Sequence, residues 1–355
     1  MTRRPRLPVA LSLLFLSTSG VVAQEGEPVL AVRVDSARHE VVLTTGPFDL
    51  PSMPGHQHDG MMTKFSTRFD WPVEAMGRGF TFELRDAEGR KVSQRVLHHL
   101  MLINNSRRQL LLPMRERIMA VGRETKNLML PNTIGMPIEA GSRMRLDIMW
   151  HNETPADADG VMLTLRIRYS PANLVPVPTT VLPLSMDLAD GPGRSNSFLV
   201  PPGRFTASRE FIMPVTGRLI AVSGHMHDWG VALRLEEAAT GKVLTTITPV
   251  LDSAGRITHM PIRLFGIAGD GLKLRANRRY RLVAVYDNRT DAPMEGMAHM
   301  DGIFSPSDLS KWPDQSSKMT AYQDDGAYVP PTVEAPMASP DSATDQSPQH
   351  QHPPR

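Results

Sequence analysis

Histidines occur in closely spaced pairs along this chain of 355 residues, which contains 12 His and 22 Met. The pairs are His56 with His58, His98 with His99, His225 with His227, and His350 with His352. Imidazole nitrogens are common ligands of transition metals, and methionine adds a soft sulfur that favours copper over Mg²⁺ or Ca²⁺. The chain has no Cys, which excludes thiolate metal sites and disulfide bonds. The sequence therefore favours metal sites built from imidazole and thioether ligands.

The pair His225 and His227 lies in a strand-like run, residues 224–230. Residues two apart on a strand point to the same face, so these two imidazoles could bind one ion. A third ligand is expected from a later strand that begins near residue 296, where Met297 and His299 share one face and Met300 lies on the other. Two imidazoles and a thioether form a site that favours copper, especially Cu(I).

The pair His98 and His99 presents a different geometry, because adjacent residues on a regular strand point to opposite faces. The two imidazoles could share an ion only if a β-bulge or a turn re-aims one of them. His151, directly after Trp150 at the end of a later strand, is the candidate for a third imidazole. Three imidazoles suit copper or zinc.

The remaining pairs lie in segments without strand-like patterns. His56 and His58 belong to a loop rich in Pro and Gly. We interpret this loop as a solvated insertion, with an accessory copper loop as the alternative. His350 and His352 lie near the C-terminus and resemble at best a weak metal scavenger.

The elements that must position these residues are predicted to be strands. Residues 80–85, 163–168 and 231–236 alternate apolar and polar side chains with a period of two, as half-buried strands do. The content of 31 Pro and 26 Gly disfavours long helices. One short helix is predicted near residues 114–122. The fold class is therefore predicted to be all-β.

An internal repeat divides the chain into two similar halves. Residues 142–154 align with residues 278–290 at a constant offset, and earlier segments also correspond. The earlier matches are 48–51 with 198–201 and 69–73 with 211–215. Two tandem homologous jelly-roll-like β-sandwich domains are the simplest architecture that explains this repeat.

The N-terminus carries several Arg, then an apolar run too short to span a bilayer, then small residues at 21–23. This pattern predicts a signal peptide over residues 1–23 and a periplasmic or secreted location. The predicted order is then a first β-sandwich domain over 24–171, a Pro-rich linker over 172–192, a second β-sandwich domain over 193–312, and a disordered tail over 313–355. Basic residues are scattered among acids at a net charge of +2, so no nucleic-acid partner is expected. Stable membrane insertion is not expected either, because no second long apolar stretch follows.

In their order along the chain, these motifs resemble the copper type II, ascorbate-dependent monooxygenases, the family of peptidylglycine α-hydroxylating monooxygenase and dopamine β-monooxygenase. The features that carry the resemblance are His-His-Leu-Met at 98–101, a lone His at 151, His-x-His-x-x-Gly at 225–230 and a downstream Met, within about residues 40 to 310. The animal enzymes are rich in disulfides, whereas this chain has no Cys.

The resemblance implies two copper ions, one in each jelly-roll domain, on either side of a solvent-filled cleft. It implies that His98, His99 and His151 hold an electron-transfer copper. It further implies that His225, His227 and Met297 hold an oxygen-activating copper, with Met300 as the alternative source of sulfur.

The implied activity is hydroxylation of an unactivated C–H bond with O₂ and a small-molecule reductant such as ascorbate as partners. No substrate-binding residue can be carried over from the family. The alternative is a non-catalytic periplasmic copper-binding or copper-resistance protein, which would bind the metal without turnover. The sequence thus predicts an exported copper protein.

Overall fold

A computed structural model describes residues 28–53, 63–125, 127–189, 197–266 and 271–313. The predicted signal peptide, the loop with His56 and His58, and the tail beyond residue 313 with His350 and His352 lie outside these residues. Apart from strands, the described part contains two single-turn 3-10 helices, η1 (Gln94–Val96) and η2 (Leu309–Lys311). In these described segments, no helix is long and apolar enough to cross a membrane.

The first half of the chain forms two sheets. The outer sheet has the order β1 (Val29–Asp35), β2 (Glu40–Leu50), β10 (Ala158–Pro171), β4 (Ala75–Arg85), β8 (Ile134–Ile138) and β11 (Thr179–Thr180), with β7 (Leu128–Met129) also paired to β4. The inner sheet has the order β3 (Thr63–Asp70), β9 (Arg143–Trp150), β5 (Leu97–Arg108) and β6 (Arg115–Gly122).

The second half also forms two main sheets. Its inner sheet has the order β12 (Leu182–Asp187), β24 (Ala298–Pro306), β15 (Gly217–Met226) and β20 (Arg263–Leu264), with β21 (Leu272–Leu274) also paired to β15. Its outer sheet has the order β14 (Gly203–Ile212), β22 (Arg279–Asn288), β16 (Gly230–Glu237) and β17 (Val243–Ile247). Two further ribbons pair β13 (Phe198–Val200) with β23 (Met294–Gly296), and β18 (Val250–Leu251) with β19 (Ile257–His259).

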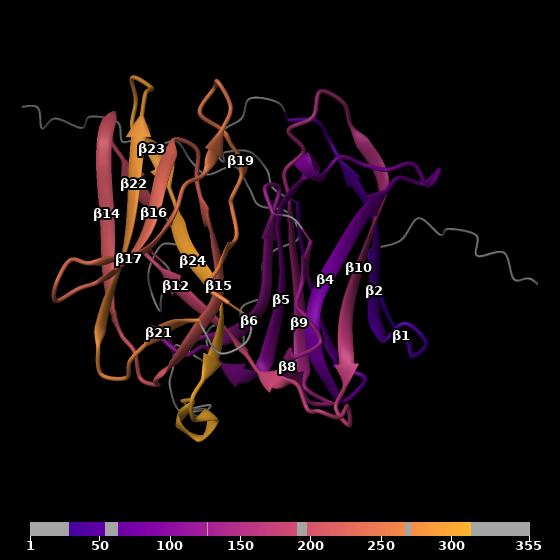
Figure 1. The fold of residues 1–355 in the computed structure, drawn as a ribbon. Coiled ribbons are helices and arrows are strands. Elements are labelled where there is room, and N and C mark those ends of the chain that lie inside the picture. The colour runs from indigo at the N-terminus through magenta and orange to yellow at the C-terminus, as the bar shows by residue number, and fades with distance from the viewer. Residues whose placement is uncertain (1–27, 54–62, 126, 190–196, 267–270, 314–355) are drawn as a thin grey trace, which may run out of the picture.

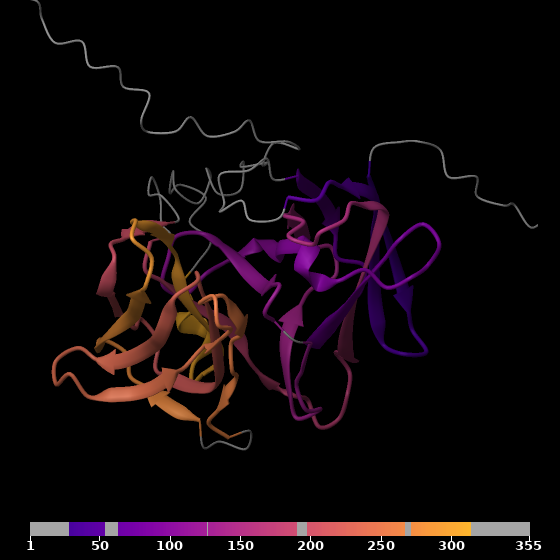
Figure 2. The same ribbon diagram turned by 90° about the horizontal axis from the view of Figure 1, so that it is seen from above.

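The four main sheets stack as successive layers, with the two inner sheets adjacent at the middle of the molecule (Figures 1 and 2). The fold is all-β and consists of two tandem jelly-roll-like β-sandwiches, as the sequence predicts. Leu110, Leu112 and Met114, between β5 and β6, belong to the hydrophobic core of the second half. The two halves are therefore joined by apolar packing.

Matching hydrogen bonds reveal the repeat in atomic detail. In the first half, the Asn152 side-chain amide donates to the carbonyls of Leu50 and Ala156, and its Oδ1 accepts from the Thr154 backbone N–H and hydroxyl. Asn288 makes the same four bonds in the second half, to Val200, Ala292 and Thr290. Both Asn side chains are buried, so each holds the end of a strand in place.

Asn288→Ala is expected to lower the free energy of unfolding by about 2–3 kcal/mol, because the mutation removes the donor to the carbonyl of the buried Val200. Urea-induced unfolding followed by tryptophan fluorescence measures this change. Thr290→Ser, which keeps the hydroxyl, is the matched control and should unfold close to the wild-type midpoint. An unchanged midpoint for Asn288→Ala would show that this turn does not stabilise the half.

Two predicted elements need correction. The helix expected near residues 114–122 is strand β6, an edge strand paired with β5, in which Met119 and Val121 are buried in the core of the first half. The predicted linker over 172–192 contains β11 and β12. Strand β12 pairs with β24 and is part of the second half, because Leu182, Leu184 and Met186 alternate toward its core.

Candidate metal centre

Six histidines gather where the inner sheets of the two halves meet, and we call them the histidine cluster. They are His98, His99 and His151 of the first half, and His225, His227 and His299 of the second. Ring centroids are 4.1 Å apart for His98 and His99, and 6.4 Å apart for His98 and His151. Across the halves, the rings of His99 and His225 lie 5.2 Å apart. The predicted ligand sets of the two domains are therefore in direct contact.

A β-bulge brings His98 and His99 to the same side of β5. Leu97 is opposite Trp150 and His99 is opposite Met149 on β9, with a register shift that leaves His98 as the extra residue. Leu97 and Leu100 are both fully buried in the hydrophobic core of the first half. The side chains of the two histidines between them therefore point to the other face of the sheet. The β-bulge that His98 and His99 need in order to share one ion, as the sequence predicts, is therefore present.

The second-half histidines share one face of the inner sheet. His225 on β15 is directly opposite His299 on β24, and their ring centroids lie 5.2 Å apart. The rings of His225 and His227 lie 5.5 Å apart, whereas Met226 between them is buried in the core. The alternation expected for this His-x-His motif is therefore present.

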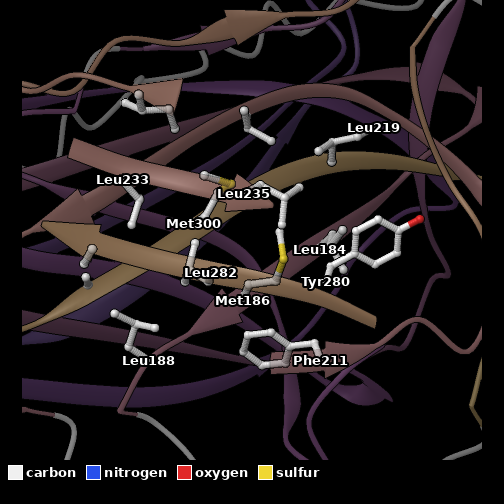
Figure 3. Packing of buried hydrophobic residues seen from close by; sticks show 14 of the residues in the cluster. Leu184, Met186, Leu188, Phe211, Leu219, Leu233, Leu235, Tyr280, Leu282 and Met300 are labelled. Atoms are coloured by element: carbon white, nitrogen blue, oxygen red, sulfur yellow. The ribbon is translucent and has the colours of Figure 1, made fainter. Parts of the chain in front are cut away.

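The two candidate methionines differ in position. The Met297 carbonyl accepts from the His227 backbone N–H at 3.1 Å, so Met297 is the cross-strand neighbour of His227, and it is half-buried. Met300 is fully buried in the core of the second half near Met186 (Figure 3). Met300 is therefore a wrong prediction as a ligand, because it points to the opposite face from its neighbour His299.

His299 is a candidate ligand that the sequence motifs do not single out. The alternation of the 297–300 segment places His299 on the same face as Met297, and the resemblance to copper monooxygenases implies a sulfur ligand there. Its register opposite His225 could have identified it.

Each second-half histidine has its Nδ1 held by an oxygen acceptor. His225 Nδ1–H donates to Glu124 Oε1 at 2.8 Å, and His299 Nδ1–H donates to Asp301 Oδ2 at 2.6 Å. His227 Nδ1 lies 3.3 Å from the Glu295 carbonyl oxygen. These contacts assign a proton to each Nδ1 and make Nε2 the candidate ligand atom, which is the usual outer-shell arrangement of metal-binding histidines.

Among the described residues, the Nε2 atom of His225 is buried and has no hydrogen-bond partner. A buried nitrogen acceptor of this kind costs stability unless something binds it. An adjoining cavity of about 20 Å³ is lined by His98, Glu124, His225 and His227, among others. This volume suits one water-sized species.

The carboxylates shift the protonation of the cluster. Burial raises the pKa of Glu124, but the neighbouring His225 outweighs it and lowers this pKa to about 2. Burial lowers the pKa of His299, but Asp301 outweighs it and raises this pKa to about 9. Without metal, the His299 ring is therefore protonated on both nitrogens at neutral pH. A metal ion that binds at Nε2 must displace that proton.

Charged residues also connect the halves around the cluster. Arg123 forms an ion pair with Glu153 of its own half and another with Asp228 of the second half, at 3.3 Å. Glu153 in turn lies 3.7 Å from Nδ1 of His151. Sequence reasoning missed Arg123, Glu124 and Asp228, because they meet their partners only through the packing of one half on the other.

Within the described segments, no group of three or more His, Asp or Glu side chains is placed so that it could hold a metal ion. The imidazole donors themselves, taken in pairs, suit copper. Two imidazoles that share an ion through nitrogens at about 2 Å have ring centroids about 5 Å apart. The spacings of 5.5 Å and 5.2 Å around His225 match this value. With the orphaned Nε2 of His225, the residues present fit a transition metal that prefers imidazole.

The arrangement differs from the separated sites that the family resemblance implies. Instead of a solvent-filled cleft between the two ligand sets, the His99 and His225 rings are in contact and Glu124 of the first half bonds to His225 of the second. The expected cleft is therefore wrong at this point of the interface. Apolar packing between the halves accounts for its closure.

No protein-family profile matches this chain, and no curated protein matches it. The chain is similar to a solved structure of recombinant peptide:N-glycanase F (PNGase F), with 9% identity and a TM-score of 0.37, covering 74% of this chain and 95% of that chain. It is also similar to the major capsid protein P2 from bacteriophage PM2, with 11% identity and a TM-score of 0.34, covering 74% and 97%. Likenesses this distant carry no argument about function.

Glu124→Gln is expected to weaken copper binding by about 10- to 100-fold, because the carboxylate that orients His225 is lost while its shape is kept. Competition with a chromophoric copper chelator measures this affinity. Glu88→Gln, at an exposed hairpin, is the control and should bind copper as the wild type does. Equal affinities in both variants would contradict the role of Glu124.

Proposed function

We propose that this chain is an exported copper-binding protein whose histidine cluster holds the metal between two jelly-roll halves. The observation that carries the proposal is the oriented second-half set, in which His225, His227 and His299 each have Nδ1 held by an oxygen acceptor. His98 and His99, turned outward by the bulge, and His151 supply the first-half set.

Copper bound at these histidines would supply one-electron redox chemistry and O₂ activation. The protein residues would hold the proton on Nδ1 of His225, His227 and His299, orient these rings and exclude bulk water through the packed interface. We propose that the reaction is reductant-dependent hydroxylation of a C–H bond, as in the enzymes that the histidine motifs resemble. His299 beside His225 would make the second-half set richer in imidazole than the predicted set of two imidazoles and one thioether.

The burial of the cluster favours a second candidate, copper storage or delivery without catalysis. His151 and His227 are 3% and 7% exposed, which suits retention of a metal better than the access of a bulky substrate. The two candidates differ in turnover, because only the enzyme consumes O₂ at the expense of a reductant.

The test is O₂ uptake by the copper-loaded protein with ascorbate, with the metal-free protein and His227→Ala as controls. Uptake above that of free copper, lost in both controls, supports the enzyme. Copper binding without such uptake supports storage or delivery. Failure of the purified chain to bind copper would overturn both candidates.

A further inference from the structure

A cavity of about 370 Å³ lies between the halves, next to the histidine cluster. Its floor comes from β12, β24 and β15 of the second half. Strand β6 of the first half, with Thr125, Asn127 and Leu128, contributes a facing wall. This volume falls within the range of roughly 300–1,000 Å³ that small-molecule sites occupy.

Strand register divides the floor of this cavity into rows. Pro183, Ile303 and Ala221 are cross-strand neighbours and form an apolar row. Ser185, Asp301 and Ser223 form the next row on the same face, which is polar. His299 and His225 follow two residues further along their strands. Successive rows lie roughly 7 Å apart, so the polar row separates the apolar floor from the histidines.

The walls of the cavity are mainly apolar, with side chains such as Phe80, Ile118, Leu128 and Ile262. Its charged residues are already engaged with each other. Asp301 bonds to His299 and to Ser185, and it is also stabilised by the positive charge of Arg117. A charged ligand would therefore lose its hydration without gaining a free counter-ion.

An independent feature points to a ligand in this cavity. His259 lines it, and the Nδ1 atom of His259 is buried without a hydrogen-bond partner in the described part of the chain. Ser223, also at the cavity, makes long contacts of 3.4 Å to the carbonyls of Met260 and Pro261, and no shorter side-chain hydrogen bond within the described segments. Both groups could pair with a hydroxyl or carbonyl group of a bound molecule.

We propose that this cavity binds an uncharged, mainly apolar small molecule. The apolar body of the ligand lies against the row of Ile303 and Ala221, and its single polar group bonds at Ser223 or His259. The polar end of such a ligand would lie about one row of the sheet, roughly 7 Å, from His225 and His299. Its role as the substrate rests on the proposed copper function, whereas the binding site itself does not.

The experiment titrates the metal-free protein with N-phenyl-1-naphthylamine, a neutral apolar probe whose fluorescence rises on burial. Saturable binding of one probe per chain is expected. Ala221→Leu and Ala120→Leu fill the cavity from opposite halves, and each should weaken binding by about tenfold or more. Ala31→Leu makes the same change on the exposed strand β1 and should have no effect. Two filling variants keep the test valid if one of them fails to fold.

Competition tests the chemical class, since 1-octanol should displace the probe at a concentration at least about tenfold lower than octanoate, which must bury its charge. Equal displacement by the two would overturn the uncharged class. Absence of saturable binding, or wild-type binding by both filled variants, would overturn the site. Copper loading is measured on the same samples. Probe binding without copper binding would refute only the proposed function, and copper binding without probe binding would refute only the cavity proposal.

Discussion

His225→Ala is expected to weaken copper binding at the second-half set by more than about 100-fold. Loss of a residue that only orients a ligand weakens metal binding by up to about 100-fold, and loss of the ligand itself should cost more. The reason is position, because the His225 ring lies within 5.5 Å of the rings of His99, His227 and His299. Isothermal titration with Cu²⁺, and bound copper measured after dialysis, report the loss.

Removing His225 also leaves Glu124 without its partner, so the alanine variant loses stability together with the metal. His225→Gln keeps a donor for Glu124 and removes the imidazole, and it should lose copper to the same extent. His39→Asn is the control, since His39 is exposed at a φ of 52° that Asn tolerates. Wild-type copper affinity in both His225 variants would refute the proposal that His225 is a copper ligand.

Asp147→Ala is expected to lower the free energy of unfolding by about 3–5 kcal/mol, the largest stability effect that we predict. Asp147 accepts from Arg145 at 3.0 Å and from the Ser66 hydroxyl at 2.6 Å, and the two charged residues are 3% and 2% exposed. Burial raises the pKa of Asp147, an effect that Arg145 opposes. The mutation would leave the Arg145 guanidinium buried without this counter-ion.

A double variant separates the cost of removing Asp147 alone from the value of the pair. Arg145→Met with Asp147→Leu removes both charges and should be more stable than Asp147→Ala by several kcal/mol. Urea-induced unfolding followed by the fluorescence of Trp150, on the same strand, measures each variant. A double variant no more stable than the single one would show that the ion pair itself stabilises the inner sheet.

The sequence predicts the fold well because its signals are local. Period-two alternation identifies the strands, and the segment that ends at Asn152 recurs at Asn288 with the same hydrogen bonds. The predicted linker is wrong because its Pro-rich composition conceals the alternation of Leu182, Leu184 and Met186. Composition was a poorer guide there than the period of the apolar residues.

The sequence predicts the site only in part. The His98–His99 pair lies on β5, whose counterpart in the repeated sheet order is β16, whereas His225 and His227 belong to β15 or its end. The two pairs are thus not repeat equivalents, and they meet only because the inner sheets of the two halves pack together. The repeat suggested one site in each domain. The contacts of Glu124 and Arg123 with the second half depend on that packing. No local pattern of the amino-acid sequence predicts them.

We propose that imidazoles from both halves hold copper where the two sandwiches meet. Anomalous diffraction at the copper edge, from crystals of copper-loaded protein, tests it most directly. We predict a copper peak at about 2 Å from Nε2 of His225, the bonding distance of a metal-bound imidazole. Copper peaks found only away from His225 and the histidines around it, in fully loaded crystals, would contradict it.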